Sequence, residues 1–186
     1  MPLTFANKIT LLRILALPFF IASVLNISSG DTISRKLALG IFIFAIITDM
    51  IDGYIARSRK EKTRSGAILD PLADKLLLAS AFICLYVEGS HLSVERIPIW
   101  IVAVVVSRDV ILIIGGMIIY GLHEKLVLES NAWGKAATFF QFITIISILT
   151  EVRLPQIILY AMLLLTVISA FEYIRKGIKT INMEKQ

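Results

Sequence analysis

Six long apolar stretches constrain this chain more than any other feature of its sequence. Each can cross the hydrocarbon core of a bilayer, which is about 30 Å thick and takes roughly 20 helical residues. The stretches are Ile9–Ile27, Lys36–Ala56, Asp70–Gly89, Ile97–Leu122, Gly134–Val152 and Leu154–Ile174. Their residues do not alternate between apolar and polar as transmembrane β-strands do. The sequence therefore predicts an all-α integral membrane protein with six transmembrane helices.

Composition supports a membrane location and excludes several other classes of protein. Of the 186 residues, 57% are hydrophobic and 18% are charged, whereas soluble domains have about 45–50% and about 25%. So much apolar material excludes a disordered chain or a nucleic-acid-binding arm. The single cysteine, Cys84, permits no intrachain disulfide and no Cys/His metal cluster. We expect a single domain over residues 1–186 that contacts membrane lipids and no nucleic acid.

The distribution of lysine and arginine predicts the orientation in the membrane. The N-terminus, the second and fourth connections and the C-terminal tail would lie on one side, and they hold 12 of the 19 basic residues. The opposite side holds 4. Because cytoplasmic loops carry the excess of positive charge, we expect both termini to be cytoplasmic. The net charge of +5 then suits loops that face anionic lipid head groups.

Charged residues inside the predicted spans need a reason to be there. Arg13, Lys75 and Arg108 are the basic ones, and a charge at the bilayer centre costs roughly 2.5–3.5 kcal/mol on insertion scales. Such groups pair with each other, line a cavity or bind ions. For Lys75 and for Asp109, the neighbour of Arg108, structural pairing and a functional role both stay open.

Four aspartates form two pairs at the predicted cytoplasmic ends of the second and third spans. Asp49 and Asp52 are three residues apart, Asp70 and Asp74 are four apart, and each pair therefore shares one helix face. Two like charges roughly 4 Å apart repel by about 4 kcal/mol at an effective dielectric of 20, so four converging carboxylates need compensation. All-oxygen ligands favour Mg²⁺, Mn²⁺ or Ca²⁺. Two such ions could stabilise the attacking and leaving oxygens of a displacement at phosphorus.

The residues between the two pairs also suit phosphate chemistry. Gly53 and Ala56 are small and leave room for a ligand near the backbone, although, taken alone, these two residues favour close helix packing. Arg57 offers a planar fork that matches a phosphate group. Thr63 and Gly66 lie in the basic connection that follows, whose charge also serves as a topology signal.

The whole segment from Asp49 to Lys75 reads DMIDGYIARSRKEKTRSGAILDPLADK. It resembles the signature of the CDP-alcohol phosphotransferase family, which is D-x2-D-G-x2-A-R, a short spacer, and G-x3-D-x3-D, and every fixed position is present. The resemblance implies six transmembrane helices and usually a homodimer. It also implies an enzyme that cleaves the pyrophosphate of a CDP-linked donor and passes the phosphatidyl group to an alcohol, releasing CMP.

The resemblance also implies roles for individual residues. Two divalent ions, Mg²⁺ or Mn²⁺, would be bound by the aspartates Asp49, Asp52, Asp70 and Asp74. Asp74 would in addition deprotonate the acceptor hydroxyl as the catalytic residue. The CDP part of the donor would contact Asp52, Gly53, Ala56, Arg57, Thr63 and Gly66.

Three segments resemble the phosphatidylglycerophosphate synthases and the related cardiolipin synthases within the family. They are DPLADK from Asp70, NKITLLRILALPFF with Asn7, Thr10 and Arg13, and GKAATFFQ with Lys135, Thr138 and Gln141. Trp133 and Gly134, just before Lys135, depart from that likeness. The implied reaction uses CDP-diacylglycerol and glycerol 3-phosphate, with the active site facing the cytoplasm from the inner or plasma membrane.

Other functions stay open at this point. The same chemistry could use phosphatidylglycerol, as in cardiolipin synthesis, or inositol phosphate as the acceptor. A divalent-cation transporter is a different class, because carboxylates inside spans also mark ion pathways. Against transport, the acidic residues gather at one membrane face and no acidic ladder continues outward.

A glycerol 3-phosphate acceptor requires cations, since its phosphate carries about −1.5 to −2 charges at pH 7. The candidates are Arg108 in the fourth span, Lys135 at the start of the fifth and Arg175 near the C-terminal tail. Structural alternatives exist for the first two: an ion pair between Arg108 and an aspartate, and a Lys135 side chain that reaches the lipid head groups.

Overall fold

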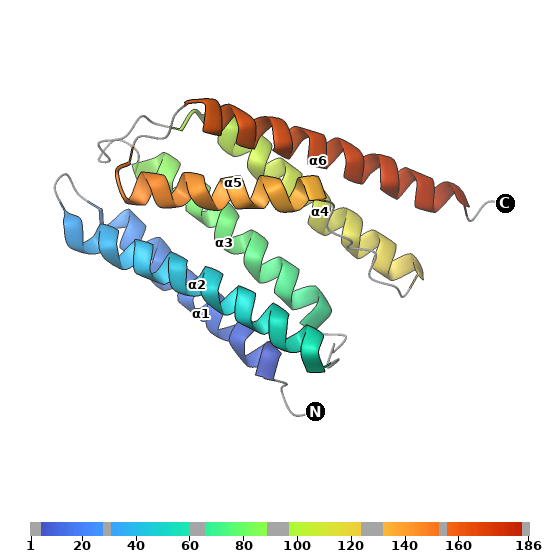
Figure 1. The fold of residues 1–186 in the computed structure, drawn as a ribbon, viewed down its shortest axis with the longest axis horizontal. Coiled ribbons are helices and arrows are strands. Elements are labelled where there is room, and N and C mark those ends of the chain that lie inside the picture. Colours follow the sequence, from blue (N-terminus) through green and yellow to red (C-terminus); the bar gives the residue numbers. More distant parts are fainter. Residues whose placement is uncertain are drawn as a thin grey trace. The chain divides into compact units, whose positions relative to one another are not determined.

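In the computed structural model, the described residues are 5–27, 31–59, 66–88, 97–123, 132–152 and 156–183. They form six α-helices (Figure 1). The helices are α1 (Phe5–Leu25), α2 (Thr32–Arg59), α3 (Gly66–Glu88), α4 (Ile99–His123), α5 (Ala132–Leu149) and α6 (Gln156–Met183). The predicted all-α class is confirmed.

Several helices extend beyond the apolar stretches that predicted them. Helix α3 begins at Gly66 rather than Asp70, and α6 continues to Met183 rather than ending at Ile174. The apolar length reports only the part suited to hydrocarbon, whereas the residues that α6 adds include Arg175, Lys176 and Lys179, which also favour the helix in water. Both aspartate pairs lie within helices, as predicted from the two apolar stretches.

Helix α2 begins with a side-chain cap. The Asp31 carboxylate oxygen Oδ1 accepts hydrogen bonds from the backbone N–H groups of Ile33 at 2.9 Å and Ser34 at 3.2 Å. These are donors that the first turn of a helix leaves without partners. Hydrogen bonds from the side chain and backbone of Ser34 and from the backbone of Ile33 hold the pKa of Asp31 below its ordinary value.

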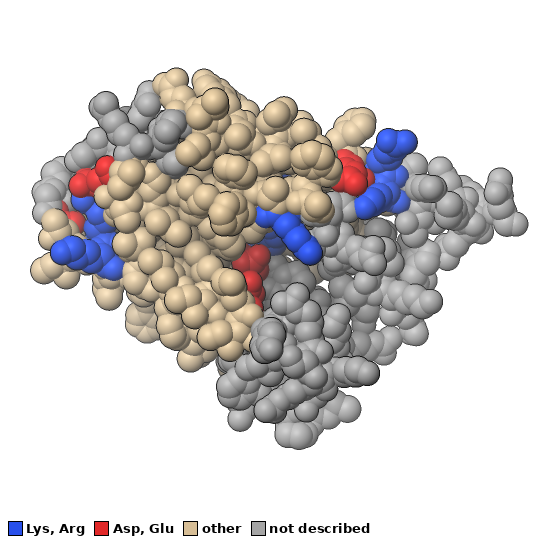
Figure 2. Space-filling model, in the orientation of Figure 1, with Lys and Arg blue, Asp and Glu red and all other residues tan. Residues whose placement is uncertain are grey.

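Three helices of the described chain are long and apolar enough to cross a membrane. Their spanning segments are Ile99–Met117, Ala132–Leu149 and Gln156–Gly177, and Thr10–Leu25 forms a shorter apolar helix. Large apolar side chains such as Phe19, Ile157 and Phe171 are exposed. On the face shown in Figure 2, most of the described surface is uncharged. Such a surface suits contact with lipid rather than with water.

The chain divides into two compact units, and each is described by itself. The first unit comprises Met1–Ile97 and Ile145–Arg153, and the second comprises Pro98–Thr144 and Leu154–Gln186. In the first unit, α1 packs against both α2 and α3. The rings of Phe20 on α1 and Phe42 on α2 pack in a tilted arrangement with their centroids 5.7 Å apart, and both side chains are buried.

The end of α5, which belongs to the first unit, is closed by a Schellman motif with glutamate in place of the usual glycine. The backbone N–H of Val152 donates to Ser147 C=O at 3.0 Å, and that of Glu151 donates to Ile148 C=O at 3.2 Å. Glu151 adopts a left-handed conformation with φ of 57°. Its carboxylate lies 2.7 Å from Nη1 of the buried Arg35 on α2. This ion pair compensates for the backbone strain of the turn.

In the second unit, α4 packs against α6. A glycine permits their close approach, because a Cβ atom at Gly115 would lie 2.8 Å from the Tyr173 ring. The Tyr173 hydroxyl donates a hydrogen bond to Leu112 C=O at 3.2 Å. Between α5 and α6, the Thr144 hydroxyl lies 3.4 Å from the Met162 sulfur. The second unit is therefore held together by polar contacts as well as by apolar packing.

Candidate active site

The signature segment occupies the end of α2 and the start of α3. The positions on α2 are Asp49, Asp52, Gly53, Ala56 and Arg57, and those on α3 are Gly66, Asp70 and Asp74. Thr63 lies outside the described residues, as do all of these side chains except those of Asp49 and Asp74. Since α1 contacts both α2 and α3, it joins the two helices that carry the signature.

Arg13 of α1 contacts the first signature aspartate directly. Its Nη1 lies 2.8 Å from Asp49 Oδ1. The Arg13 side chain is only 1% exposed, whereas that of Asp49 is 40% exposed. A buried guanidinium therefore holds one side of a carboxylate that stays accessible to a ligand. The sequence marks Arg13 as a charge inside a predicted span but carries no signal that links it to Asp49.

Asp74 and Lys75 lie side by side on α3, and both are half-buried. Asp74 therefore combines a protected position with access to solvent, which a proton acceptor requires. The helical backbone also puts Asp70 and Asp74 one turn apart, on one face of α3.

The signature carboxylates suit a divalent ion by their chemistry. Hard cations such as Mg²⁺ and Mn²⁺ prefer carboxylate oxygens, and the Asp49 carboxylate remains accessible although Arg13 contacts it. The described side chains by themselves contain no group of three metal-binding residues. Two of the four carboxylates, those of Asp52 and Asp70, are outside that set.

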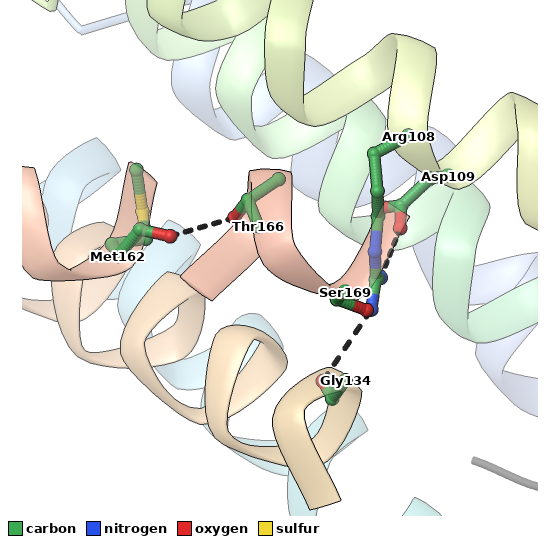
Figure 3. Close-up of polar contacts among 6 residues, drawn as sticks. All are labelled: Arg108, Asp109, Gly134, Met162, Thr166 and Ser169. Atoms are coloured by element: carbon green, nitrogen blue, oxygen red, sulfur yellow. Dashed lines mark hydrogen bonds and ion pairs between the residues drawn. The ribbon is translucent and has the colours of Figure 1, made fainter. Parts of the chain in front are cut away.

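A second polar cluster lies in the second unit around Arg108, shown in Figure 3. Arg108 Nη1 donates to Asp109 Oδ1 at 2.6 Å, and Nη2 donates to Ser169 Oγ at 2.8 Å. A longer contact of 3.5 Å joins Nη2 to Gly134 C=O on α5. The ion pair between Arg108 and an aspartate, one of the two alternatives for this residue, is therefore present. Binding of an acceptor phosphate by Arg108 stays a prediction.

The other two candidate acceptor residues lie on helices of the same unit. Lys135 follows Gly134 in the first turn of α5, and its side chain is exposed. Arg175 lies on α6, six residues after Ser169, and is also exposed. Exposure of both side chains permits contact with an anion, and it equally permits contact with lipid head groups.

Two partners of Arg108 carried little signal in the sequence. Ser169 is a single serine in an apolar helix, and such residues usually bond to their own backbone. Gly134 begins the GKAATFFQ segment and, with Trp133, departs from the likeness to the glycerophosphate enzymes, but neither feature predicts a contact with Arg108. A buried arginine in a span predicts that polar partners exist, but it does not tell which helix supplies them.

Comparison with known proteins decides the family. The sequence profile of CDP-alcohol phosphatidyltransferases matches residues 3–168. The chain belongs to this family. It is 33% identical to a CDP-diacylglycerol–glycerol-3-phosphate 3-phosphatidyltransferase of Bacillus subtilis, covering 92% of this chain and 93% of the relative.

Two other relatives of this phosphatidyltransferase have matching names. A protein of Haemophilus influenzae with the same name is 33% identical, and the alignment covers 90% of this chain and 89% of that protein. A probable phosphatidylglycerophosphate synthase of Mycobacterium tuberculosis is 30% identical, and the alignment covers 97% of this chain and 85% of that protein. Family membership confirms the resemblance drawn from the signature and makes the segment around Asp49 and Asp74 the candidate active site.

Proposed function

We propose that this phosphatidyltransferase transfers the phosphatidyl group of CDP-diacylglycerol to glycerol 3-phosphate, giving phosphatidylglycerophosphate and CMP. The observation that carries the proposal is the complete signature in a chain that aligns, over 90% or more of its length, with relatives named for this reaction. The whole chain, residues 1–186, acts as one phosphatidyltransferase domain.

The reaction is a displacement at the phosphorus of the phosphatidyl group. The hydroxyl oxygen of glycerol 3-phosphate forms a bond to this phosphorus, and the bond from the phosphorus to the bridging oxygen breaks. CMP leaves with the electron pair, and Asp74 accepts the proton of the attacking hydroxyl. A general base in such a position contributes about 10²–10⁴-fold to the rate.

The signature aspartates bind two divalent ions, Mg²⁺ or Mn²⁺. The ligands are Asp49, Asp52, Asp70 and Asp74. When bound there, such ions would supply positive charge at the pyrophosphate and at the leaving oxygen. Support comes from Asp49, whose carboxylate is accessible while Arg13 holds one of its oxygens.

The remaining residues of the signature hold the CDP part of the donor. They are Gly53, Ala56, Arg57, Thr63 and Gly66, together with Asp52. The acceptor phosphate is bound by Arg108, Lys135 and Arg175. A guanidinium has five N–H donors, so the ion pair of Arg108 with Asp109 leaves donors for a phosphate oxygen.

The enzyme acts as a homodimer in the inner or plasma membrane, surrounded by lipid. It has six spans, and both termini and the active site face the cytoplasm. Two observations support the membrane location and orientation: the bias of 12 basic residues against 4, and the apolar helices α4, α5 and α6.

Release of CMP by the purified protein in lipid nanodiscs tests the proposal. CDP-diacylglycerol is supplied with glycerol 3-phosphate, phosphatidylglycerol or inositol phosphate, in EDTA and after Mg²⁺ or Mn²⁺ is restored. We expect rapid release with glycerol 3-phosphate only, abolished by EDTA and restored by either ion. Asp49→Asn serves as the inactive control.

Three results would contradict the proposal. Turnover with another acceptor would overturn the choice of glycerol 3-phosphate. Full turnover in EDTA would overturn the metal-dependent chemistry. Uptake of a divalent ion into proteoliposomes, without CMP release from any acceptor, would indicate a transporter instead.

A further inference from the structure

Arg108 makes more contacts than a single ion pair, because groups on three helices surround its guanidinium. Three helices of the second unit contribute to this cluster: α4 supplies Arg108 and Asp109, α5 supplies Gly134, and α6 supplies Ser169. All three charged or hydroxyl side chains are buried. A buried charge is costly unless it is paired and hydrogen-bonded, so the contacts around Arg108 fix its position closely.

The contacts also fix which donors of Arg108 are used. Nη1 donates to Asp109 Oδ1, and Nη2 donates to Ser169 Oγ and points to Gly134 C=O. The buried Nε has no hydrogen-bond partner among the described residues. Because the guanidinium is planar and rigid, holding its two Nη atoms also sets the direction of the Nε–H. A donor of fixed direction therefore remains for an anionic oxygen.

Gly134 determines how closely α5 approaches this cluster. A Cβ atom at this position would lie 3.1 Å from Arg108 Nη2 and 3.2 Å from Ser169 Oγ. Even an alanine would therefore push both groups by a few tenths of an ångström. The next residue along α5 is Lys135, so the contact at Gly134 links the position of this lysine to that of Arg108.

We propose that Asp109, Ser169 and Gly134 are positioning residues, which hold Arg108 in the orientation that binds the phosphate of the acceptor. The inference rests on the proposed function, since it requires Arg108 to contact that phosphate. The three residues act through Arg108 and do not themselves touch the substrate.

The test compares two hydroxyls on α6, one turn apart. Ser169→Ala removes the hydroxyl that contacts Arg108. Thr166→Val removes an equally buried hydroxyl that donates to Met162 C=O at 2.7 Å (Figure 3). Gly134→Ala, Ser169→Thr and Arg108→Gln complete the set. For each variant in nanodiscs, the KM of each substrate and the inhibition constant of inorganic phosphate against glycerol 3-phosphate are measured.

We expect Ser169→Ala to raise the KM for glycerol 3-phosphate about 3- to 10-fold, which is the size of one ordinary net hydrogen bond, because Arg108 keeps its charge and loses only one of the contacts that orient it. The inhibition constant of inorganic phosphate should rise by the same factor. The KM for CDP-diacylglycerol and kcat should not change. Gly134→Ala should raise the same two constants. Ser169→Thr retains a hydroxyl at this position and should therefore keep both constants at their wild-type values. Thr166→Val should change neither constant.

The outcomes separate this inference from the proposed function. If Arg108→Gln raises the KM for glycerol 3-phosphate while Ser169→Ala and Gly134→Ala do not, the positioning role is wrong and the acceptor site stands. If Arg108→Gln leaves that KM unchanged, the acceptor site itself is wrong. If Ser169→Ala affects both substrates equally and lowers the melting temperature, the hydroxyl serves only the fold. Should Ser169→Ala fail to fold, Gly134→Ala decides between these results.

Discussion

Arg13 in the first unit and Arg108 in the second are both buried and both paired with an aspartate, but the two pairs differ. Arg13 reaches from α1 to Asp49 on α2, and the Asp49 side chain remains 40% exposed. Arg108 pairs with the next residue of its own helix, Asp109, whose side chain is 3% exposed. An exposed carboxylate can bind a further ligand, whereas a buried one serves only its neighbours. The first pair therefore suits a metal site, and the second suits the orientation of an arginine.

The first effect is a large loss of turnover, and it comes from changing Asp49 in its pair with Arg13. Asp49→Asn removes a metal ligand and should lower kcat by about 10²-fold or more, a loss typical for groups that stabilise transition-state charge. Asp109→Asn should leave kcat nearly unchanged and raise only the KM for glycerol 3-phosphate. Steady-state release of CMP measures both variants. Equal losses of kcat in the two would remove the distinction between the pairs.

The second effect concerns the residue at the other end of the signature. Asp74→Asn should lower turnover by about 10²–10⁴-fold, because a general base is lost. Binding of CDP-diacylglycerol, measured at equilibrium, should remain. Loss of donor binding together with turnover would show that Asp74 acts chiefly as a metal ligand.

The third effect concerns binding of the acceptor by Arg108 and Lys135 in the second unit, which should change KM and not kcat. Arg108→Gln and Lys135→Gln each remove a charged contact to the acceptor phosphate, worth about 1.5–3 kcal/mol. The KM for glycerol 3-phosphate should therefore rise about 10- to 150-fold. The KM for CDP-diacylglycerol is the internal control and should stay the same. An equal rise for both substrates would favour the structural roles of these residues.

The fourth effect uses the ion pair between Arg35 and Glu151, which lies outside both proposed sites. Glu151→Gln should lower the free energy of unfolding by about 1–3 kcal/mol, because it leaves the buried Arg35 without an anionic partner. Glu172→Gln, which weakens the partly exposed pair of Glu172 with Lys176 within one helix, is the control and should cost at most about 1 kcal/mol. Thermal unfolding in detergent measures both. A loss of activity in Glu151→Gln at unchanged stability would contradict a purely structural pair.

The smallest effect is expected at the cap of α2. Asp31→Ala should lower the melting temperature slightly at pH 7, since two backbone donors lose their acceptor. The lowered pKa of Asp31 means that its carboxylate stabilises the fold above the unfolded pKa of about 3.9 and stops doing so as the pH falls through the folded value. The difference between wild type and variant should therefore shrink at acid pH. A constant difference would exclude a role for the ionised cap.

The sequence predicted the helices better than their ends. Hydrophobic length identifies a helix suited to lipid, because about 20 apolar residues have few other uses. It does not report where the helix ends in water. Helix α2 begins at Thr32 because Asp31 caps it, and α5 ends in a turn that Glu151 and Arg35 stabilise. These ends depend on single side chains and on contacts distant in sequence.

At the site, the chemistry of the residues could be predicted from the sequence more fully than their contact partners. The signature from Asp49 to Asp74 identified the family, because its spacing along two helices is specific. The contact of Arg13 with Asp49 and that of Ser169 with Arg108 join residues far apart in the chain. Periodicity within one helix carries no information about such contacts, and only tertiary packing determines them.

Binding of Mn²⁺ is the most direct test of the difference between the two pairs. Electron paramagnetic resonance measures the affinity of purified wild type, Asp49→Asn and Asp109→Asn in nanodiscs, without turnover. We predict that wild type and Asp109→Asn bind Mn²⁺ equally well and that Asp49→Asn binds it much more weakly. Wild-type affinity in Asp49→Asn, or an equal loss in Asp109→Asn, would contradict the account.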